Sequence, residues 1–204
     1  MKESSPRFLM PMSTARPRGA RLITAFSPKL GRTVRAFERA EFQQWIRLEA
    51  DPDVTSFCEH PRRVGAGDDG QLIDFWVDRH GQEEMLVMEL GQGAVELPSS
   101  VQGLPLRVVP AAEQAAATVW VSNWIHMIPV INATRGLAPK ALIKSVLSLV
   151  RRPLALSYVE HELSVGDPAI VRGAIFELLR TGRLMAPTLH SQPLSLHTTV
   201  EPMS

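Results

Sequence analysis

The sequence predicts a mixed α/β fold followed by a small helical domain. Between residues 28 and 138, apolar segments of strand length alternate with segments of helical periodicity, as in layered α/β proteins. Two of the strand-like segments, 72–77 and 84–90, flank a short turn and read as a hairpin. After residue 138 the order becomes helix, helix, turn, helix and hairpin, which is the order of a winged-helix domain. We therefore place the domain boundary near residue 138.

The chain is expected to begin with a mobile arm and a helix. Residues 1–27 are rich in Ser, Pro, Arg and Met and show no periodicity, which predicts an arm without fixed structure. From Phe37 to Ala50 the spacing becomes helical, and Pro52 cannot continue the helix. One face of this predicted helix carries Glu38, Phe42, Trp45, Ile46 and Glu49.

The middle of the chain predicts a sheet. Both hairpin strands are apolar at nearly every position, which suits strands that are covered on both faces. Residues 103–110 predict a third strand, followed by an alanine-rich helix from 111 to 118. Residues 119–131 read as a further strand and the segment that follows it. If the hairpin turn centres between His80 and Gly81, Asp74 lies opposite Val87 and diagonally adjacent to Glu89 on one face.

The domain from 139 to 204 is predicted by its helices and their ends. Residues 139–152 form an amphipathic helix with Pro139 in the first turn, and residues 154–163 form a second. Asp167 can cap a third helix that begins at Pro168, and Gly182 follows its end. Residues 183–187 and 194–200 can pair as the terminal hairpin.

Composition and charge restrict the classes of function. Cys58 is the one cysteine, which excludes a disulfide framework and a cysteine-rich zinc site. No apolar run is long enough to cross a bilayer and the basic N-terminus lacks a signal-peptide core, so we expect a cytoplasmic protein. Residues 1–35 carry a net charge of +7, residues 36–96 of −9 and residues 97–204 of +3. This segregation favours a nucleic-acid partner beside a carboxylate-rich site, although solvated faces alone would also give it.

Three carboxylates are the candidate chemical groups. Asp74 and Glu89 lie on the two strands of the hairpin, and two acids in an apolar strand pair are costly unless a cation lies between them. Glu38, on the apolar side of its helix, would add a third acid. Such a set can hold Mg²⁺ or Mn²⁺ and orient water at a phosphodiester. The alternatives are that Glu89 ends its strand in solvent and that Glu38 serves the helix dipole.

Part of the sequence resembles a known protein family. The segment "KLGRTVRAFERAEFQQWIRLEADPDVTSFCEHP" (29–61), followed by "LIDFWV" and "LVMEL", resembles the N-terminal domain of TnsA-type transposon endonucleases. The resemblance implies a restriction-endonuclease-like PD-(D/E)xK core over residues 28–138 and a winged helix over residues 139–204. It implies that the protein cuts one strand at transposon ends, with Glu38, Asp74 and Glu89 as metal ligands. It also implies an integrase-fold transposase and an AAA+ ATPase regulator as partners, the latter at the C-terminal domain, in a bacterial, nucleoid-associated setting.

The sequence departs from the family pattern at one position. Gly91 stands where the lysine of the (D/E)xK motif belongs, and that lysine normally activates water or stabilises charge. No lysine lies between residues 30 and 139. Gln92 can orient a water by hydrogen bonds and is the candidate substitute, whereas Arg39 and Arg107 are poor bases.

Basic residues outside the candidate site are candidates for DNA contact. Lys29, Arg32 and Arg35 follow the arm, and Arg172 and Arg180 lie on the predicted recognition helix with Arg183 after it. Glu177 in the same helix weakens a role in reading DNA, so a winged helix that binds a protein partner is an equal alternative. Two further functions stay open: an adaptor of the same complex with an impaired site, and a winged-helix transcriptional regulator.

Overall fold

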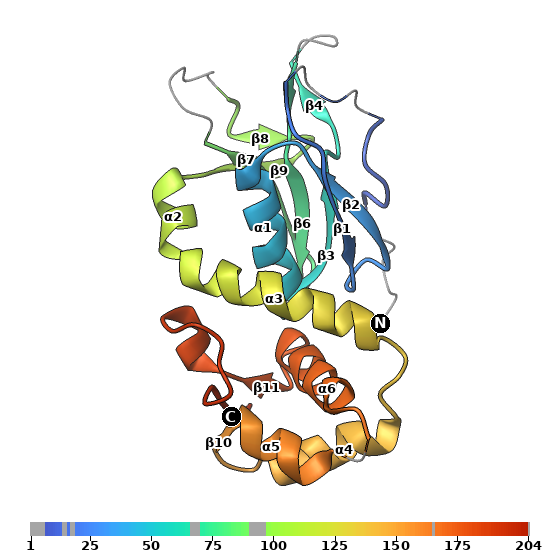
Figure 1. Ribbon diagram of the computed structural model, residues 1–204. Helices are drawn as coiled ribbons and strands as arrows, with labels where there is room; N and C mark the ends of the chain where they lie inside the picture. Colours follow the sequence, from blue (N-terminus) through green and yellow to red (C-terminus); the bar gives the residue numbers. More distant parts are fainter. Residues whose placement is uncertain are drawn as a thin grey trace. The chain divides into compact units, whose positions relative to one another are not determined.

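The computed structural model describes residues 7–13, 16, 19–65, 70–89, 97–164 and 166–203 (Figure 1). The chain divides into two compact units. The first comprises Met1–Glu49 and Asp53–Ala116, and the second comprises Ala50–Pro52 and Ala117–Ser204. The division therefore falls at residue 116 rather than near residue 138, because the helix that follows residue 117 packs within the second unit.

A five-stranded mixed sheet forms the centre of the first unit, with the strand order β3-β6-β7-β9-β8. Strands β3 (Val54–Glu59), β6 (Phe75–Arg79) and β7 (Gln82–Met88) are antiparallel neighbours. Strand β9 (Leu104–Val109) runs parallel to β7, and the short β8 (Ser100–Val101) pairs with β9. The predicted hairpin and third strand are confirmed, with bounds shifted by a few residues. Pairing of Arg79 with Gln82 places the centre of the turn between His80 and Gly81, which is the alternative that sets Asp74 opposite Val87.

One helix and a second hairpin flank this sheet. Helix α1 (Arg39–Ala50) lies across one face of the sheet and buries Trp45, Ile46 and Leu48 (Figure 1). Strands β1 (Ile23–Ser27) and β2 (Arg32–Ala36) form an antiparallel hairpin, and β2 lies against β3. The predicted helix is thus confirmed, but it begins at Arg39 rather than at Phe37.

The predicted mobile arm is wrong for part of its length. Residues 23–27 form β1, and Arg7, Phe8 and Met12 contact the domain. The ring of Phe8 is tilted against Trp76 with centroids 5.7 Å apart. Phe8 packs against a buried cluster on the sheet formed by Cys58, Ile73, Trp76, Met85, Val87, Val101 and Leu104.

A short strand pair and a short helix complete the first unit. Strands β4 (Arg63–Val64) and β5 (Gln71–Leu72) pair beyond the ends of β3 and β6. Asp74, expected within a strand over 72–77, lies between β5 and β6. Helix α2 (Ala111–Ala116) confirms the predicted alanine-rich helix.

The second unit is built on four helices and a three-stranded sheet. The helices are α3 (Thr118–Thr134), α4 (Lys140–Leu149), α5 (Leu156–Leu163) and α6 (Pro168–Arg180), and a 3-10 turn, η1, spans Pro187–His190. The sheet has the order β10-β12-β11, from β10 (Leu154–Ala155), β12 (Thr199–Pro202) and β11 (Leu184–Met185). Apart from α3, this is the predicted order of helix, helix, turn, helix and hairpin.

The predicted strand at 119–131 is wrong, because these residues belong to α3. Buried residues recur in α3 at helical spacing, at Val121, Trp124, Ile128 and Ile131. Pro129 lies inside the helix on its exposed side. A run that is apolar on nearly all sides fits a strand and a buried helix equally well, and only its length of 17 residues favours the helix.

The start and end of α6 agree with the prediction. The Asp167 side chain accepts a hydrogen bond of 2.8 Å from the Ala169 amide, and Pro168 is the first helical residue. Gly182, beyond the end of the helix, has a φ of 67°, which glycine adopts without strain. Among the described residues, no helix combines the length and the apolar character needed to cross a membrane.

Candidate metal centre

Three buried side chains of the first unit converge on one point. They are Glu41 from the first turn of α1, His60 directly after β3, and Asp74 directly before β6. One ligand atom from each lies within 4.8 Å of the other two. Their exposed fractions are 7%, 3% and 5%. Glu41, His60 and Asp74 are called the acid–histidine cluster below.

The pairing of β3 with β6 places His60 opposite Asp74, because the register that pairs Glu59 with Phe75 continues one residue further, and the sheet becomes irregular directly after this point. Three residues separate Glu59 from Arg63 on one chain segment, whereas two separate Leu72 from Phe75 on the other, so the first segment carries one extra residue. The His60 amide donates to the Asp74 carbonyl over 2.9 Å. His60 has a φ of 46°, in the left-handed region that few non-glycine residues adopt. Bulges and strained residues of this kind concentrate at functional sites.

Hydrogen bonds fix the orientation of the two carboxylates. The Glu41 carboxylate accepts a bond of 2.6 Å from the Phe37 amide and lies 3.4 Å from His60 Nε2. The Asp74 carboxylate accepts a bond of 2.6 Å from the Met88 amide of β7. Each ligand group therefore has a partner that holds it in place, as is usual around metal sites.

The electrostatics of the cluster favour a cation. Burial raises the pKa of Asp74 well above its ordinary value, and the negative charges of Glu41 and Glu38 raise it further against the opposing Met88 hydrogen bond. Burial alone would also raise the pKa of Glu41, but hydrogen bonds from His60 and from the Phe37 amide lower it. Without a cation, these interactions therefore favour a proton on Asp74 and the negative charge on Glu41. A divalent ion would supply the positive charge and displace that proton.

The donor atoms fit a divalent cation of intermediate hardness. Mg²⁺ prefers oxygen ligands with several waters, whereas Mn²⁺ accepts carboxylate oxygens together with an imidazole nitrogen. Two carboxylates and one histidine therefore suit Mn²⁺ at least as well as Mg²⁺.

Of the predicted acids, only Asp74 lies in the acid–histidine cluster. Glu38 was expected to face the sheet from the helix, but it precedes α1 and is exposed. It remains near enough to raise the pKa of Asp74. Glu89 follows the end of β7, is exposed, and accepts a hydrogen bond of 2.8 Å from the Ala111 amide at the start of α2. This arrangement agrees with the alternative interpretation, in which Glu89 ends its strand in solvent. Gly91 and Gln92 lie outside the described residues.

Sequence reasoning missed Glu41 and His60. Glu41 lies one helical turn before the buried Trp45, so its spacing was as informative as that of Glu38. His60 lies inside the segment that carried the family resemblance, but nothing in its spacing marks it as a ligand. Its contact with Asp74 depends on the pairing of β3 with β6.

Most of the predicted DNA-contacting residues are engaged within the protein. Lys29 Nζ donates to the Leu48 carbonyl over 2.8 Å, and Arg32 forms a two-pronged ion pair with the buried Glu59. Arg35 is exposed. In the second unit, Arg172 pairs with Glu160 of α5, and Arg180, which is 8% exposed, pairs with Glu177.

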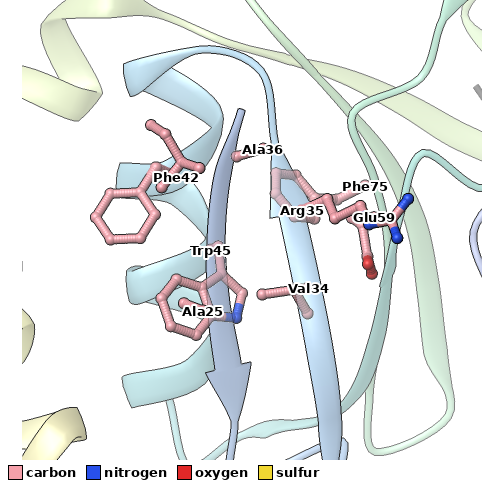
Figure 2. Close-up of a pocket in the computed structure, with 9 residues that line it drawn as sticks. Ala25, Val34, Arg35, Ala36, Phe42, Trp45, Glu59 and Phe75 are labelled. Carbon is pink, nitrogen blue, oxygen red and sulfur yellow. The ribbon is translucent and has the colours of Figure 1, made fainter. Parts of the chain in front are cut away.

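A shallow apolar pocket lies between α1 and the β1–β2 hairpin (Figure 2). Some of its lining residues are sequence neighbours of the acid–histidine cluster, but the pocket is separate from the cluster. Phe42 and Trp45 of α1 face Ala25 and Val34 of the hairpin there, and no member of the acid–histidine cluster lines it. The pocket therefore contributes no ligand to the candidate metal centre.

The fold and the cluster together define a mixed α/β protein with a buried candidate site for a divalent cation. Comparison of the chain with protein-family models and with curated proteins found no match.

Proposed function

We propose that this chain is a metal-dependent DNA endonuclease of the TnsA type, one component of a heteromeric transposase. The observation that carries the proposal is the convergence of Glu41, His60 and Asp74 on one buried point. The resemblance of residues 29–61 and of the two following strands to that family supplies the reaction class. In this proposal the first unit has the restriction-endonuclease-like fold, and its mixed sheet with a flanking helix is compatible with that fold.

The cluster residues would hold the metal, Mg²⁺ or Mn²⁺. When bound, such an ion supplies Lewis-acid chemistry at a phosphodiester and lowers the pKa of a water. Asp74 and Glu41 contribute the negative charge, and His60 contributes a neutral nitrogen ligand. The Met88 and Phe37 amides keep the two carboxylates oriented when substrate approaches.

The absence of a lysine at position 91 limits which groups could activate a water molecule. Among the described residues, Lys29 is held against Leu48 at the other end of α1, while Lys140 and Lys144 belong to the second unit. Gly91 offers no side chain, so the activation of water would rest on the metal and on Gln92. This site would therefore depend more strongly on its metal than one that has the lysine.

The proposed partners are transposon-end DNA, an integrase-fold transposase and an AAA+ ATPase regulator at the C-terminal unit. In that unit both arginines of α6 are paired with carboxylates, which reduces the charge they can offer to phosphates. This observation favours a winged helix that contacts protein over one that reads DNA.

A second candidate function is an adaptor of the same complex that no longer cuts DNA. The observation that favours it is Gly91 in the place of the lysine. The buried acid–histidine cluster argues against it, because two carboxylates that compete for one proton are costly to keep without a role.

The test is nicking of supercoiled plasmid and of transposon-end DNA with Mg²⁺ or Mn²⁺, by the protein alone and with its transposase and ATPase. Asp74→Asn and His60→Ala should abolish cleavage, and the exposed carboxylate variant Glu162→Gln should cut as the wild type does. Cleavage that persists in Asp74→Asn would overturn the assigned site. Assembly of the complex without cleavage in any mixture would establish the adaptor instead.

A further inference from the structure

Residues 7–13 cross the first unit and reach the candidate metal centre. The Arg7 guanidinium donates to the Gln102 carbonyl over 3.2 Å, and Phe8 packs on the buried cluster around Trp76. Further along, the Met12 amide donates a hydrogen bond of 2.9 Å to the His60 carbonyl. We call residues 7–13 the N-terminal strap.

The strap is anchored at its two ends and exposed between them. Phe8 is half-buried, whereas Leu9 and Met10 are 63% and 70% exposed. An apolar side chain that docks on the core and an amide that bonds a distant carbonyl are the contacts of a segment with a defined position. Because the residues between these two contacts are exposed, the contacts at Phe8 and Met12 hold the strap, and burial of the whole segment does not.

Met12 contacts the one residue of the cluster whose backbone is strained. His60 holds a φ of 46°, and such a conformation persists only where the surroundings fix it. The His60 amide is bound to Asp74, and its carbonyl is bound to Met12. The strap therefore supplies one of the two backbone hydrogen bonds that fix His60, and with it the direction of the imidazole.

We propose that the N-terminal strap positions His60 for metal binding, so that strap docking and metal binding strengthen one another. Met12 and Phe8 act as positioning residues, since they touch His60 and the core rather than the metal or the substrate. The inference rests on the proposed metal site. Coupling of this kind is reciprocal: if the docked strap raises the affinity for the metal, the bound metal stabilises the docked state of the strap by the same free energy.

The first test is Mn²⁺ binding to the full chain, measured by titration calorimetry and by the electron paramagnetic resonance of free Mn²⁺. Met12→Pro removes the amide donor, because proline has no backbone N–H. Its matched control is Met10→Pro, because among the described contacts the Met10 amide makes no hydrogen bond. Phe8→Ala removes the apolar anchor, and the exposed Leu9→Ala is its control.

We expect Met12→Pro and Phe8→Ala to weaken Mn²⁺ binding about tenfold, as loss of a group that orients a ligand does elsewhere. The two controls should bind as the wild type does. Thermal unfolding of metal-free Met12→Pro should match that of Met10→Pro, which separates positioning from loss of the fold. Equal affinity in all five proteins would overturn the inference while leaving the metal site intact.

The second test is hydrogen exchange across residues 7–13 with and without Mn²⁺. Saturating Mn²⁺ should slow exchange of the strap amides in the wild type and leave it unchanged in His60→Ala. Exchange that does not respond to bound Mn²⁺ would overturn the coupling. If the wild type binds no Mn²⁺ at all, the metal site itself fails, and the strap has no site to position.

Discussion

The ring of Phe37 lies parallel to the imidazole of His60, with ring centroids 5.0 Å apart and planes 10° apart. The Phe37 backbone amide also donates to the Glu41 carboxylate. One residue therefore contacts two of the three candidate ligands, His60 through its side chain and Glu41 through its backbone. Phe37 is 6% exposed, so both contacts are shielded from water.

Phe37→Leu keeps the amide and removes the stacked ring. We expect the free energy of unfolding of the metal-free protein to fall by about 1–2 kcal/mol, from the lost aromatic contact and the smaller buried area. Urea denaturation measures this loss. A value unchanged from the wild type would mean that the stacked pair contributes nothing to the fold of the cluster.

Asp74→Asn tests the charge state of the cluster. Because the pKa of Asp74 is raised, its contribution to stability is fully present below the ordinary value of 3.8 and is lost as the pH rises through the raised pKa. The introduced asparagine would stay neutral throughout, so the metal-free variant should be more stable than the wild type at neutral pH by on the order of 1 kcal/mol. Urea denaturation at a series of pH values checks this. A variant that is less stable at neutral pH, with an unchanged pH dependence, would contradict a protonated Asp74.

Mn²⁺ should stabilise the folded protein. At a concentration 100 times the Kd, a ligand that binds only the folded state adds about 2.7 kcal/mol to the free energy of unfolding. This gain should vanish in His60→Ala and in Asp74→Asn, and it should persist in Glu162→Gln. Glu89→Gln is expected to keep the gain too, since Glu89 caps α2. Loss of the gain in Glu89→Gln would return Glu89 to the ligand set.

The arginines of α6 should contribute little to DNA affinity. Arg172→Ala leaves the buried Glu160 without its partner and should destabilise the protein by about 1–2 kcal/mol, discounted for the partial exposure of the arginine. DNA affinity, measured by fluorescence anisotropy at several salt concentrations, should not change. The matched variant Arg183→Ala removes an exposed arginine directly after the helix. If Arg172→Ala instead lowers the salt dependence by about one counterion, α6 contacts phosphates.

Gly173→Ala should be among the most destabilising single changes in the second unit. A Cβ at residue 173 would lie 1.9 Å from the Thr134 hydroxyl of α3. Alanine gains about 1 kcal/mol over glycine in helix propensity, but a clash of this size outweighs that gain. We expect a net loss of about 2–3 kcal/mol, read from the thermal midpoint. Adding Thr134→Ala should recover part of the loss, and no recovery would place the strain elsewhere.

The sheet and most helices of this chain could be predicted because their signals are local. The turn residues between two apolar segments marked the hairpin, although its register stayed open until the structure paired Arg79 with Gln82, and Asp167 with Pro168 marked the start of α6. The error at α3 came from a segment that is apolar on most sides, where periodicity does not separate a strand from a buried helix. The domain boundary was misplaced for the same reason.

The candidate site was predicted less completely because two of its members depend on long-range geometry. Glu38 and Glu41 both fit the apolar side of the helix by spacing. Because α1 begins at Arg39, Glu41 lies in its first turn and Glu38 lies before the helix. The position of this start follows from the end of β2 at Ala36. His60 reaches Asp74 through the pairing of β3 with β6, two strands that are distant in the sequence, and no local pattern reports which strands pair.

The left-handed backbone at His60 restricts which side chains could replace it during evolution or in a randomised library. Among non-glycine residues, His, Asn and Asp occupy this conformation most readily. All three also offer a nitrogen or oxygen to a cation, whereas glycine would relieve the backbone and provide no ligand. Selection for a folded chain and selection for a metal ligand therefore retain nearly the same few residues. We expect functional variants at this position to be confined to them.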